Sequence, residues 1–450
     1  MTPRKEILRI AVPVSAEFVV MLTVNFINQI IVGGLGTATI AAVGFANSIT
    51  FIPLVVVSAL GASLGILVAR SFGAGRHDEI NATTSVALFL STASSFVFAG
   101  ILIFSPEAFL SAVGASPTVA SIGAIYLPVA ALALPFQVGG SVLSGLYRST
   151  GHAKIPMWVT FATVTSGALL SFLLVYGIGP FPRLGVAGAA VGLLVGAIAK
   201  FSILIFIAYG PLQLVHWHAP WARHGWSTIV SPLLVLAVPL AITELFWTLG
   251  IFFYNVVFQQ ISDEALAAAQ IAATLEGVFI VASIGLMVAA TALIGKSIGE
   301  GDAEGARQWT RRVIKAGFVS AVIFGTLYLA SILTLPFLFP EVENHVLVVA
   351  SIGIVIAAAV QIFKVQNMIL GAGVLPSGND VRGVILGDVV GAFVVGLPIA
   401  IVLGLYTPLA VFGVFLARSI EEIAKLFIFK WRTNRIDWDK LAQEQHVVAA

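Results

Sequence analysis

The sequence predicts an all-α polytopic membrane protein, with about twelve transmembrane helices in two six-helix, pseudo-symmetric lobes around a central cleft. Hydrophobic residues fill 59% of its 450 positions and charged residues only 10%, against about 45–50% and about 25% in soluble chains. Long apolar runs recur along the whole chain, and the second half repeats patterns of the first. A soluble enzyme, a disordered scaffold and a nucleic-acid binder are therefore excluded.

Six apolar runs fill the first part of the chain, and each is bounded by charged residues, glycine or proline. A helix needs about 20 apolar residues to cross the hydrocarbon core, and every run is long enough. The run that follows Arg4 and Lys5 is too long for the apolar region of a signal peptide. The predicted spans are 8–33, 40–69, 82–105, 118–146, 155–177 and 184–209.

A connection rich in tryptophan and histidine, 210–228, separates these runs from six more. We interpret it as a cytoplasmic linker between an N-terminal lobe, 1–209, and a C-terminal lobe, 229–432. Residues 433–450 are predicted to form a cytoplasmic tail. The predicted spans of the second half are 229–259, 264–295, 313–338, 345–372, 383–404 and 408–430.

Lysine and arginine gather in alternate connections between the predicted spans. Because these residues are enriched in cytoplasmic loops, such connections are predicted to face the cytoplasm. The opposite connections carry a single positive charge, at Arg183. Both termini are therefore predicted to be cytoplasmic, in a multi-pass protein of the cell inner (plasma) membrane. The positive connections are those at 4–9, 70–76, 148–154, 223, 296–315, 382 and 430–440.

An internal repeat relates the two halves. Ala11–Pro13 recurs as Ala237–Pro239, an offset of 226 positions. Because each half has an even number of predicted spans, both halves enter the membrane from the cytoplasm as parallel repeats. Two like bundles that face a common cleft suit alternating access. Further matches join Arg70–Gly75 to Lys296–Gly301, Thr150-Gly151 to Ser377-Gly378, and Ala199-Lys200 to Ala424-Lys425.

Motifs for ATP hydrolysis or other catalysis are not evident, so the protein is not predicted to be an enzyme. The string Ala290–Ser297 approaches a phosphate-binding loop, but it lacks the first glycine and follows a membrane helix rather than a strand. The chain has no cysteine, which excludes disulfides and thiolate chemistry. Transport by this chain would then draw on an ion gradient.

Ionisable side chains inside the predicted spans mark candidate functional positions, because each costs a few kcal/mol to place in hydrocarbon. The first half offers Glu17, near the cytoplasmic end of its span, where simple hydration is an equal explanation. Helix rise places Glu244 and Glu276 at a similar level near mid-membrane. The other candidates of the second half are Lys364, Asp388 and Arg418, with Glu421 and Glu422 nearer the cytoplasm.

Lys364 and Asp388 each lie roughly 10–12 Å from the cytoplasmic ends of their spans, so they are predicted to pair. A structural ion pair and a role in coupling both stay open for them. Glu244 and Glu276 suit a proton site, because the charged form of a carboxylate is disfavoured away from water. Sodium is the alternative, with further oxygens from Thr243, Thr274 or Asn255.

The ordered set of motifs in this duplicated chain resembles the multidrug and toxic compound extrusion (MATE) transporters over nearly its whole length. The resemblance implies a membrane transporter with two six-helix lobes. It rests on Ala11–Pro13, Gly145–Gly151, Leu184–Ala190, Thr243–Trp247, Gly295–Gly299, Ser377–Asp380 and Gly396–Pro398.

The resemblance also implies where ion coupling lies. MATE transporters often carry a cation-binding aspartate in the first helix, and the matching position here is Asn28. The partner amides of their fifth helix fall on Gly167 and Ser171. The resemblance therefore implies that the first half lacks this site and that coupling lies in the second half. The second-half pattern that is similar to a prokaryotic branch comprises Glu244, Glu276, Lys364, Asn367 and Asp388.

We therefore expect a secondary active antiporter that exports amphipathic, cationic organic compounds in exchange for H⁺ or Na⁺. H⁺ is the favoured coupling ion, and Na⁺ at Glu244 and Glu276 is the alternative. We expect no other metal or cofactor, and a monomer in the bilayer. Two alternatives stay open: a flippase of lipid-linked precursors, which would line its cleft with arginine and lysine, and a non-transporting membrane scaffold.

Overall fold

The computed structural model describes residues 2–112, 114–216, 226–340 and 342–447, and the regular structure within them is helical. Six long helices of the first half match the predicted spans to within a few residues. A short additional helix, α4, precedes α5. The helices are α1 (Pro3–Gly33), α2 (Thr37–Gly73), α3 (His77–Phe104), α4 (Pro106–Ala112), α5 (Pro117–Ser149), α6 (Lys154–Tyr176) and α7 (Val186–Tyr209).

The second half is more broken, because several of its predicted spans consist of successive short helices. The elements are α8 (Trp226–Ile261), α9 (Asp263–Gly299), α10 (Ala303–Ala330), η1 (Ser331–Thr334), α11 (Leu335–Leu338), α12 (Asn344–Ala359), α13 (Gln361–Ile369), η2 (Leu370–Val374), α14 (Leu375–Ser377), α15 (Val381–Val389), η3 (Val390–Gly396), α16 (Leu397–Leu405), α17 (Ala410–Thr433) and α18 (Trp438–Val447).

The prediction of an all-helical membrane protein is confirmed, while the number of apolar spans is smaller than twelve. Among the residues that the structure describes, ten helices are long and apolar enough to cross a membrane, or eleven if one bent pair counts as a single span. The predicted span 408–430 is the helix α17, which carries several charged side chains and is correspondingly less apolar. Those side chains are Arg418, Glu421, Glu422 and Lys425.

Wide helical turns interrupt two predicted spans of the second half, 345–372 and 383–404, and a 3₁₀ turn, η1, lies near the end of a third, 313–338. The predicted span 345–372 bends by 54° between α12 and α13. The segments η2 and η3 are wide π-helical turns, which often occur at functional sites. Each ends just before a Leu-Pro pair, at Pro376 and at Pro398. Since proline lacks an N–H and its ring clashes with the carbonyl four residues earlier, a wider turn relieves the clash.

The chain forms two compact units. The N-terminal unit is Ala16–Ala241, and the C-terminal unit combines Met1–Ser15 with Ile242–Ala450. These units differ from the predicted lobes, because the helices α1 and α8 each contribute residues to both. The two boundaries, after residues 15 and 241, are related by the same offset of 226 positions as the sequence repeat.

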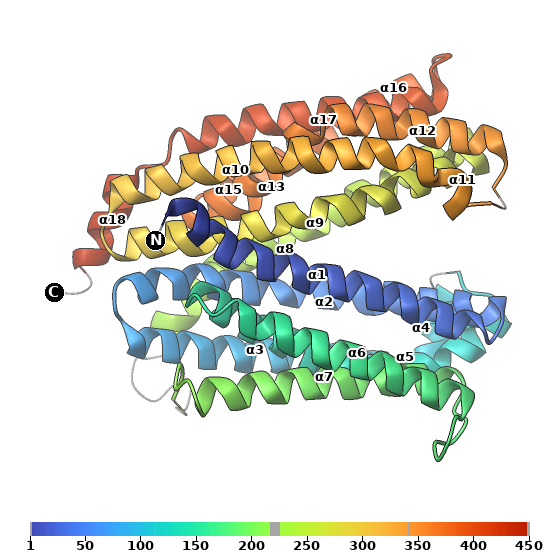
Figure 1. Ribbon diagram of the computed structural model, residues 1–450, viewed down its shortest axis with the longest axis horizontal. Coiled ribbons are helices and arrows are strands. Elements are labelled where there is room, and N and C mark those ends of the chain that lie inside the picture. The colour runs from blue at the N-terminus through green and yellow to red at the C-terminus, as the bar shows by residue number, and fades with distance from the viewer. Residues whose placement is uncertain (1, 113, 217–225, 341, 448–450) are drawn as a thin grey trace. The chain divides into compact units, whose positions relative to one another are not determined.

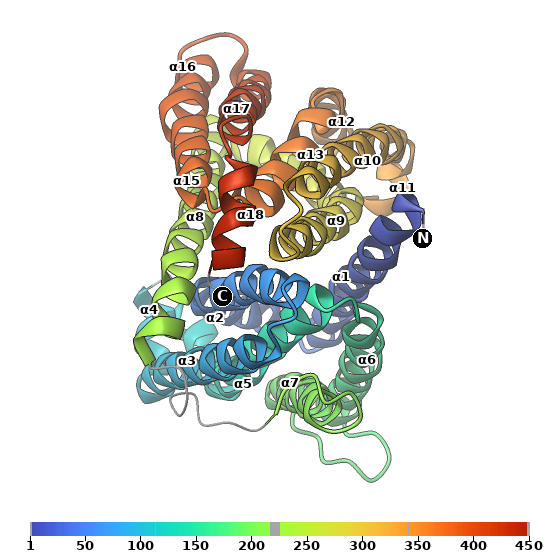
Figure 2. The ribbon, with the colours of Figure 1, turned by 90° about the vertical axis from the view of Figure 1, so that its left-hand side faces the viewer.

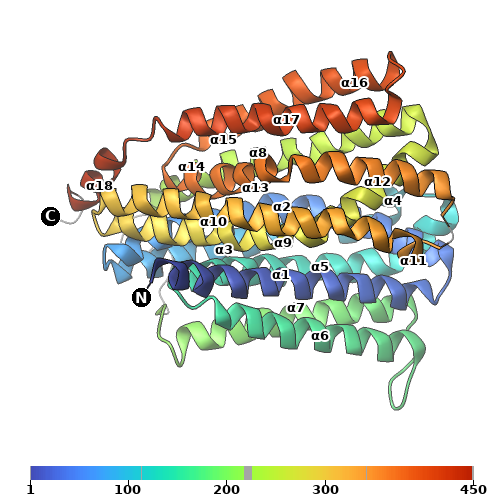
Figure 3. The same cartoon turned by 45° about the horizontal axis from the view of Figure 1, so that its top comes forward.

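Each unit has its own apolar core. In the N-terminal unit α2, α3 and α5 pack together, and α6 packs along α7, as Figure 1 shows. In the C-terminal unit α9, α10 and α13 pack against one another and are seen nearly end-on in Figure 2. The helix α17 packs on α15, η3 and α16, and Figure 3 shows it running beside them. Among the buried charged residues, Glu421 and Lys425 lie on α17.

The predicted linker and tail lie partly outside the described residues. Of the linker 210–228, residues 217–225 lie outside them, and α8 begins at Trp226. Within the tail, α18 packs on α9 and α10, and an ion pair joins Asp439 of α18 to Arg307 of α10. Residues 448–450 of the tail lie outside the described residues. The described part of the tail is thus a helix anchored on the C-terminal unit.

Candidate functional site

Glu276 of α9 forms a buried ion pair in the C-terminal unit. The Lys364 ammonium of α13 lies 2.8 Å from Glu276 Oε1, and the two side chains are 23% and 10% exposed respectively. The guanidinium of Arg418 on α17 is also near enough to interact electrostatically with this carboxylate. Three predicted candidates therefore meet around Glu276, from three different helices.

Asp388 of α15 belongs to a second cluster, which we name the Lys425 bridge: Asp388, Glu421, Lys425 and Tyr254. The Lys425 ammonium lies 2.6 Å from Glu421 Oε1 and 3.4 Å from Asp388 Oδ1. The Tyr254 hydroxyl of α8 donates a hydrogen bond of 2.5 Å to Glu421 Oε2. All four side chains are largely buried. One lysine thus joins two carboxylates on neighbouring helices.

The predicted pairing of Lys364 with Asp388 is wrong. Both residues lie in ion pairs, but Lys364 pairs with Glu276 and Asp388 pairs with Lys425. Helix rise gave their depth along the membrane normal. It could not give the direction in which each side chain leaves its helix, and this direction determines the partner.

Two glycines of the wide turn η3 let side chains of the Lys425 bridge pack against its backbone. A Cβ atom at Gly391 would lie 2.4 Å from Lys425 Cγ, and one at Gly396 would lie 2.1 Å from the Tyr254 hydroxyl oxygen. Real Cβ atoms do not approach other atoms this closely. The lysine stem and the phenol therefore pack directly on the backbone of η3, at positions where a side chain would displace them.

Further polar contacts hold α13 and α8 to α17. The Asn367 amide donates to the Glu422 backbone carbonyl at 2.7 Å and to Glu422 Oε2 at 2.8 Å. The Arg418 guanidinium lies 5.5 Å from the centre of the Tyr254 ring, a cation–π distance. The predicted candidates Asn367 and Arg418 thus lie at the borders of the two ion-paired clusters.

Glu244 differs from the other candidates, because its carboxylate has no hydrogen bond or ion pair with another described residue. Its side chain is exposed on α8. Asp388 is near enough to repel it electrostatically, whereas Glu276 interacts with Lys364 and Arg418. The structure therefore does not join Glu244 and Glu276 in one site. Asn255, which was a candidate oxygen ligand, is half-buried on α8.

Glu17 is the centre of a buried cluster in the N-terminal unit, and its side chain is only 1% exposed. Arg148 Nη2 of α5 lies 2.6 Å from Oε2, and the Lys200 ammonium of α7 lies 3.1 Å from Oε1. The Thr160 hydroxyl of α6 donates to Oε1 at 2.9 Å. The simple hydration considered for Glu17 is therefore wrong, because one carboxylate holds two cations and ties four helices together.

Asn28, at the position that the resemblance aligns with a first-helix aspartate, lies in a packed environment. Asn28 Oδ1 is buried without a hydrogen-bond partner in the described part of the chain. The Ser171 hydroxyl donates to the Ala189 carbonyl at 3.2 Å, and Gly167 lies at a close backbone crossing with Gly192. Ser171 and Gly167 thus serve the packing of α6 against α7.

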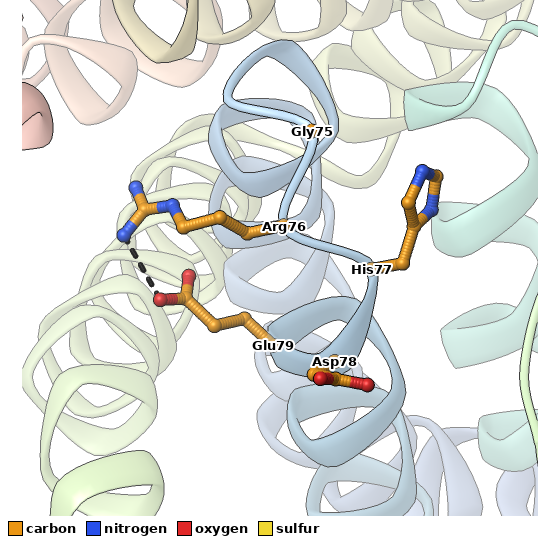
Figure 4. A pocket seen from close by; sticks show the side chains of 5 residues that line it. All are labelled: Gly75, Arg76, His77, Asp78 and Glu79. Carbon is orange, nitrogen blue, oxygen red and sulfur yellow. Dashed lines mark hydrogen bonds and ion pairs between the residues drawn. The ribbon is translucent and has the colours of Figure 1, made fainter. Parts of the chain in front are cut away.

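A surface hollow lies at the turn between α2 and α3. Within it Arg76 Nη1 and Glu79 Oε1 form an ion pair of 2.9 Å, drawn as a dashed line in Figure 4. The Ser71 hydroxyl also donates to Glu79. Both contacts are partly buried and short-range in sequence, and we interpret them as support for the turn. The lining residues are Gly75, Arg76, His77, Asp78 and Glu79.

Sequence reasoning missed Lys425, Arg148, Lys200 and Tyr254 as site residues. One signal was present, because the repeat aligns Ala199-Lys200 with Ala424-Lys425. Both of these lysines hold buried carboxylates, one in each unit. Between 2 and 447, leaving out 113, 217–225 and 341, no group of three or more His, Cys, Asp or Glu side chains is placed to hold a metal ion.

A duplicated bundle of membrane-spanning helices with ion-paired side chains buried in each unit is typical of multi-pass membrane transporters. A protein-family model described as MatE matches residues 13–173 and 239–402. The chain therefore belongs to the MatE family of transporters.

Relatives of known name cover most of the chain. A probable multidrug resistance protein NorM of Bradyrhizobium diazoefficiens is 27% identical over 95% of this chain and 92% of its own length. Multidrug and toxin extrusion protein 1 of Danio rerio is 23% identical over 98% of this chain and 73% of its own. A solved structure of a MOP superfamily transporter from Pyrococcus furiosus is 20% identical in sequence and superposes with a TM-score of 0.88. The match covers 97% of this chain and 97% of that one. The solved structure shows the same fold.

Proposed function

We propose that this MATE transporter is a multidrug efflux antiporter that exports amphipathic, cationic organic compounds in exchange for protons. The names of its relatives, which include a multidrug resistance protein and a toxin extrusion protein, support export of varied small molecules. The absence of an ATP-binding motif in the sequence supports an ion gradient as the energy source.

The proposal of proton coupling rests on a contrast within the C-terminal unit, between Glu244 and the carboxylates that pair with lysines. Lysines hold Glu276, Asp388 and Glu421, whereas Glu244 has no ion pair among the described residues. A carboxylate without a fixed partner can bind a proton or a cationic substrate in turn. Protonation of Glu244 from the outside would release the cation, and deprotonation on the cytoplasmic side would prepare the next one.

Transport by the purified protein in liposomes tests this proposal. A fluorescent organic cation should move when a pH difference is imposed across sodium-free membranes, and the Glu244→Gln variant should not move it. The wild-type protein without a gradient is the control for leak. Movement that needs a sodium gradient and ignores the pH difference would refute proton coupling.

We further propose that the protein is a monomer in the inner membrane with both termini in the cytoplasm. Because the chain has no cysteine, single cysteines report the topology directly. Ser116 and Asn434 are exposed, so a maleimide can reach both where water does. An impermeant maleimide should label Ser116→Cys in intact cells and Asn434→Cys only after permeabilisation. The reverse pattern would overturn the proposed orientation.

A further inference from the structure

The ammonium of Lys425 lies between two carboxylates, and one of these carboxylates also accepts a hydrogen bond from a phenol. Asp388 and Glu421 each place a carboxylate oxygen against it, and the Tyr254 hydroxyl bonds the second oxygen of Glu421. The Lys425 side chain is only 8% exposed. A hard monovalent cation such as Na⁺ prefers oxygen ligands of this kind, so a positive charge of the chain itself occupies a place suited to such an ion.

The charges around Lys425 are mostly negative, so the cluster would attract another cation if the lysine were absent. Besides the members of the bridge, Glu422 and Arg418 of α17 act on it electrostatically. Glu244 of α8 repels Asp388. The carboxylates outnumber the cations, and η3 holds the lysine stem against Gly391.

We propose that Lys425 is a built-in cation that occupies the Lys425 bridge and excludes Na⁺ from it. This inference rests on the proposed ion-driven antiport, because it bars one of the two candidate coupling ions from these carboxylates. The Lys425 ammonium pairs with both Asp388 and Glu421, and offsets part of their negative charge without a metal ion. Removal of the ammonium leaves two buried carboxylates that bind Na⁺ in its place.

The repeat provides a matched control. Lys200 aligns with Lys425 and also lies against a buried carboxylate, that of Glu17. Arg148 bonds the same carboxylate at 2.6 Å. Loss of Lys200 therefore leaves Glu17 neutralised by arginine, and no sodium site forms there.

The test measures the melting temperature of the purified full-length protein while NaCl replaces choline chloride at constant ionic strength. A ligand that binds the folded state raises stability with the logarithm of its concentration. The melting temperature of Lys425→Met should rise with the Na⁺ concentration. The melting temperatures of the wild type and of Lys200→Met should not change with Na⁺. A folded Lys425→Met variant that does not respond to Na⁺ would overturn the proposal.

The wild-type titration keeps the proposal testable even if Lys425→Met does not fold. Stabilisation of the wild type by Na⁺ over choline would show that the bridge admits sodium, which contradicts the proposal. Lys425→Arg, which keeps the charge, should remain insensitive to Na⁺, and sodium-dependent stabilisation of this variant would contradict the proposal as well. Because these measurements detect binding, they are independent of the liposome experiment, whose failure would refute proton-driven antiport instead.

Discussion

Replacement of Glu244 by glutamine should abolish drug resistance in cells that lack their own efflux pumps, while the protein still inserts in the membrane. Glutamine has nearly the shape of glutamate but can neither take up a proton nor carry a negative charge. Because the Glu244 carboxylate has no ion pair among the described residues, its loss leaves no buried cation without a partner. The variant should therefore accumulate normally, and growth on a toxic organic cation should fall to the level of cells without the transporter.

Asn28→Ala is the control for the assignment of coupling to the second half. Its amide lies in the N-terminal unit and has a buried oxygen without a hydrogen-bond partner in the described part of the chain. We expect this variant to retain most of the resistance. An inactive Asn28→Ala together with an active Glu244→Gln would move the coupling site to the first half.

Replacement of Glu17 by glutamine should destabilise the protein strongly. The carboxylate accepts bonds from Arg148, Lys200 and Thr160, and both cations are only 15% exposed. Removal of one partner of a buried ion pair leaves an uncompensated charge, which costs about 3–5 kcal/mol. The melting temperature of the purified protein, followed by tryptophan fluorescence, should fall well below that of the wild type.

Two further variants separate this effect from a general loss of negative charge. Glu107→Gln removes a carboxylate that is exposed on α4, and its melting temperature should match the wild type. Glu17→Gln combined with Lys200→Met removes one of the two stranded cations, so it should recover part of the lost stability. If Glu17→Gln melted like Glu107→Gln, the cluster would not be a structural centre of the N-terminal unit.

The long helices could be predicted from the sequence because their cause is local. Each apolar run is long enough to cross a bilayer, and charged residues or glycine mark its ends. The interruptions at η2 and η3 also had a local signal in Pro376 and Pro398, which interrupt the helical hydrogen bonds. The charged helix α17 departs from the pattern, since hydropathy alone does not show that its charges neutralise one another within the unit.

The candidate site was predictable as a set of residues but not as a set of pairs. Intramembrane charges are rare enough for the sequence to single out Glu276, Lys364 and Asp388. Their partners depend on how each helix is rotated about its axis, which depth does not determine. The contact between Glu421 and Lys425 could have been predicted, because residues four apart on a helix are neighbours. Glu17 needed the packing of α5, α6 and α7 around it.

The helices α1 and α8 are each divided between the two units, so that each half of the chain gives one segment to the other unit. This is the arrangement of a domain-swapped dimer, here within a single chain. Residues before Ala16 belong to the C-terminal unit, where the Ser15 hydroxyl donates to the Val281 carbonyl at 3.3 Å. Their repeat counterparts, which end at Ala241, belong to the N-terminal unit, where Ala237 is part of a buried core. Exchange of an identical element is a low-cost route to a dimer. A chain cut in the linker would therefore give two fragments, each of which carries a segment that completes the other.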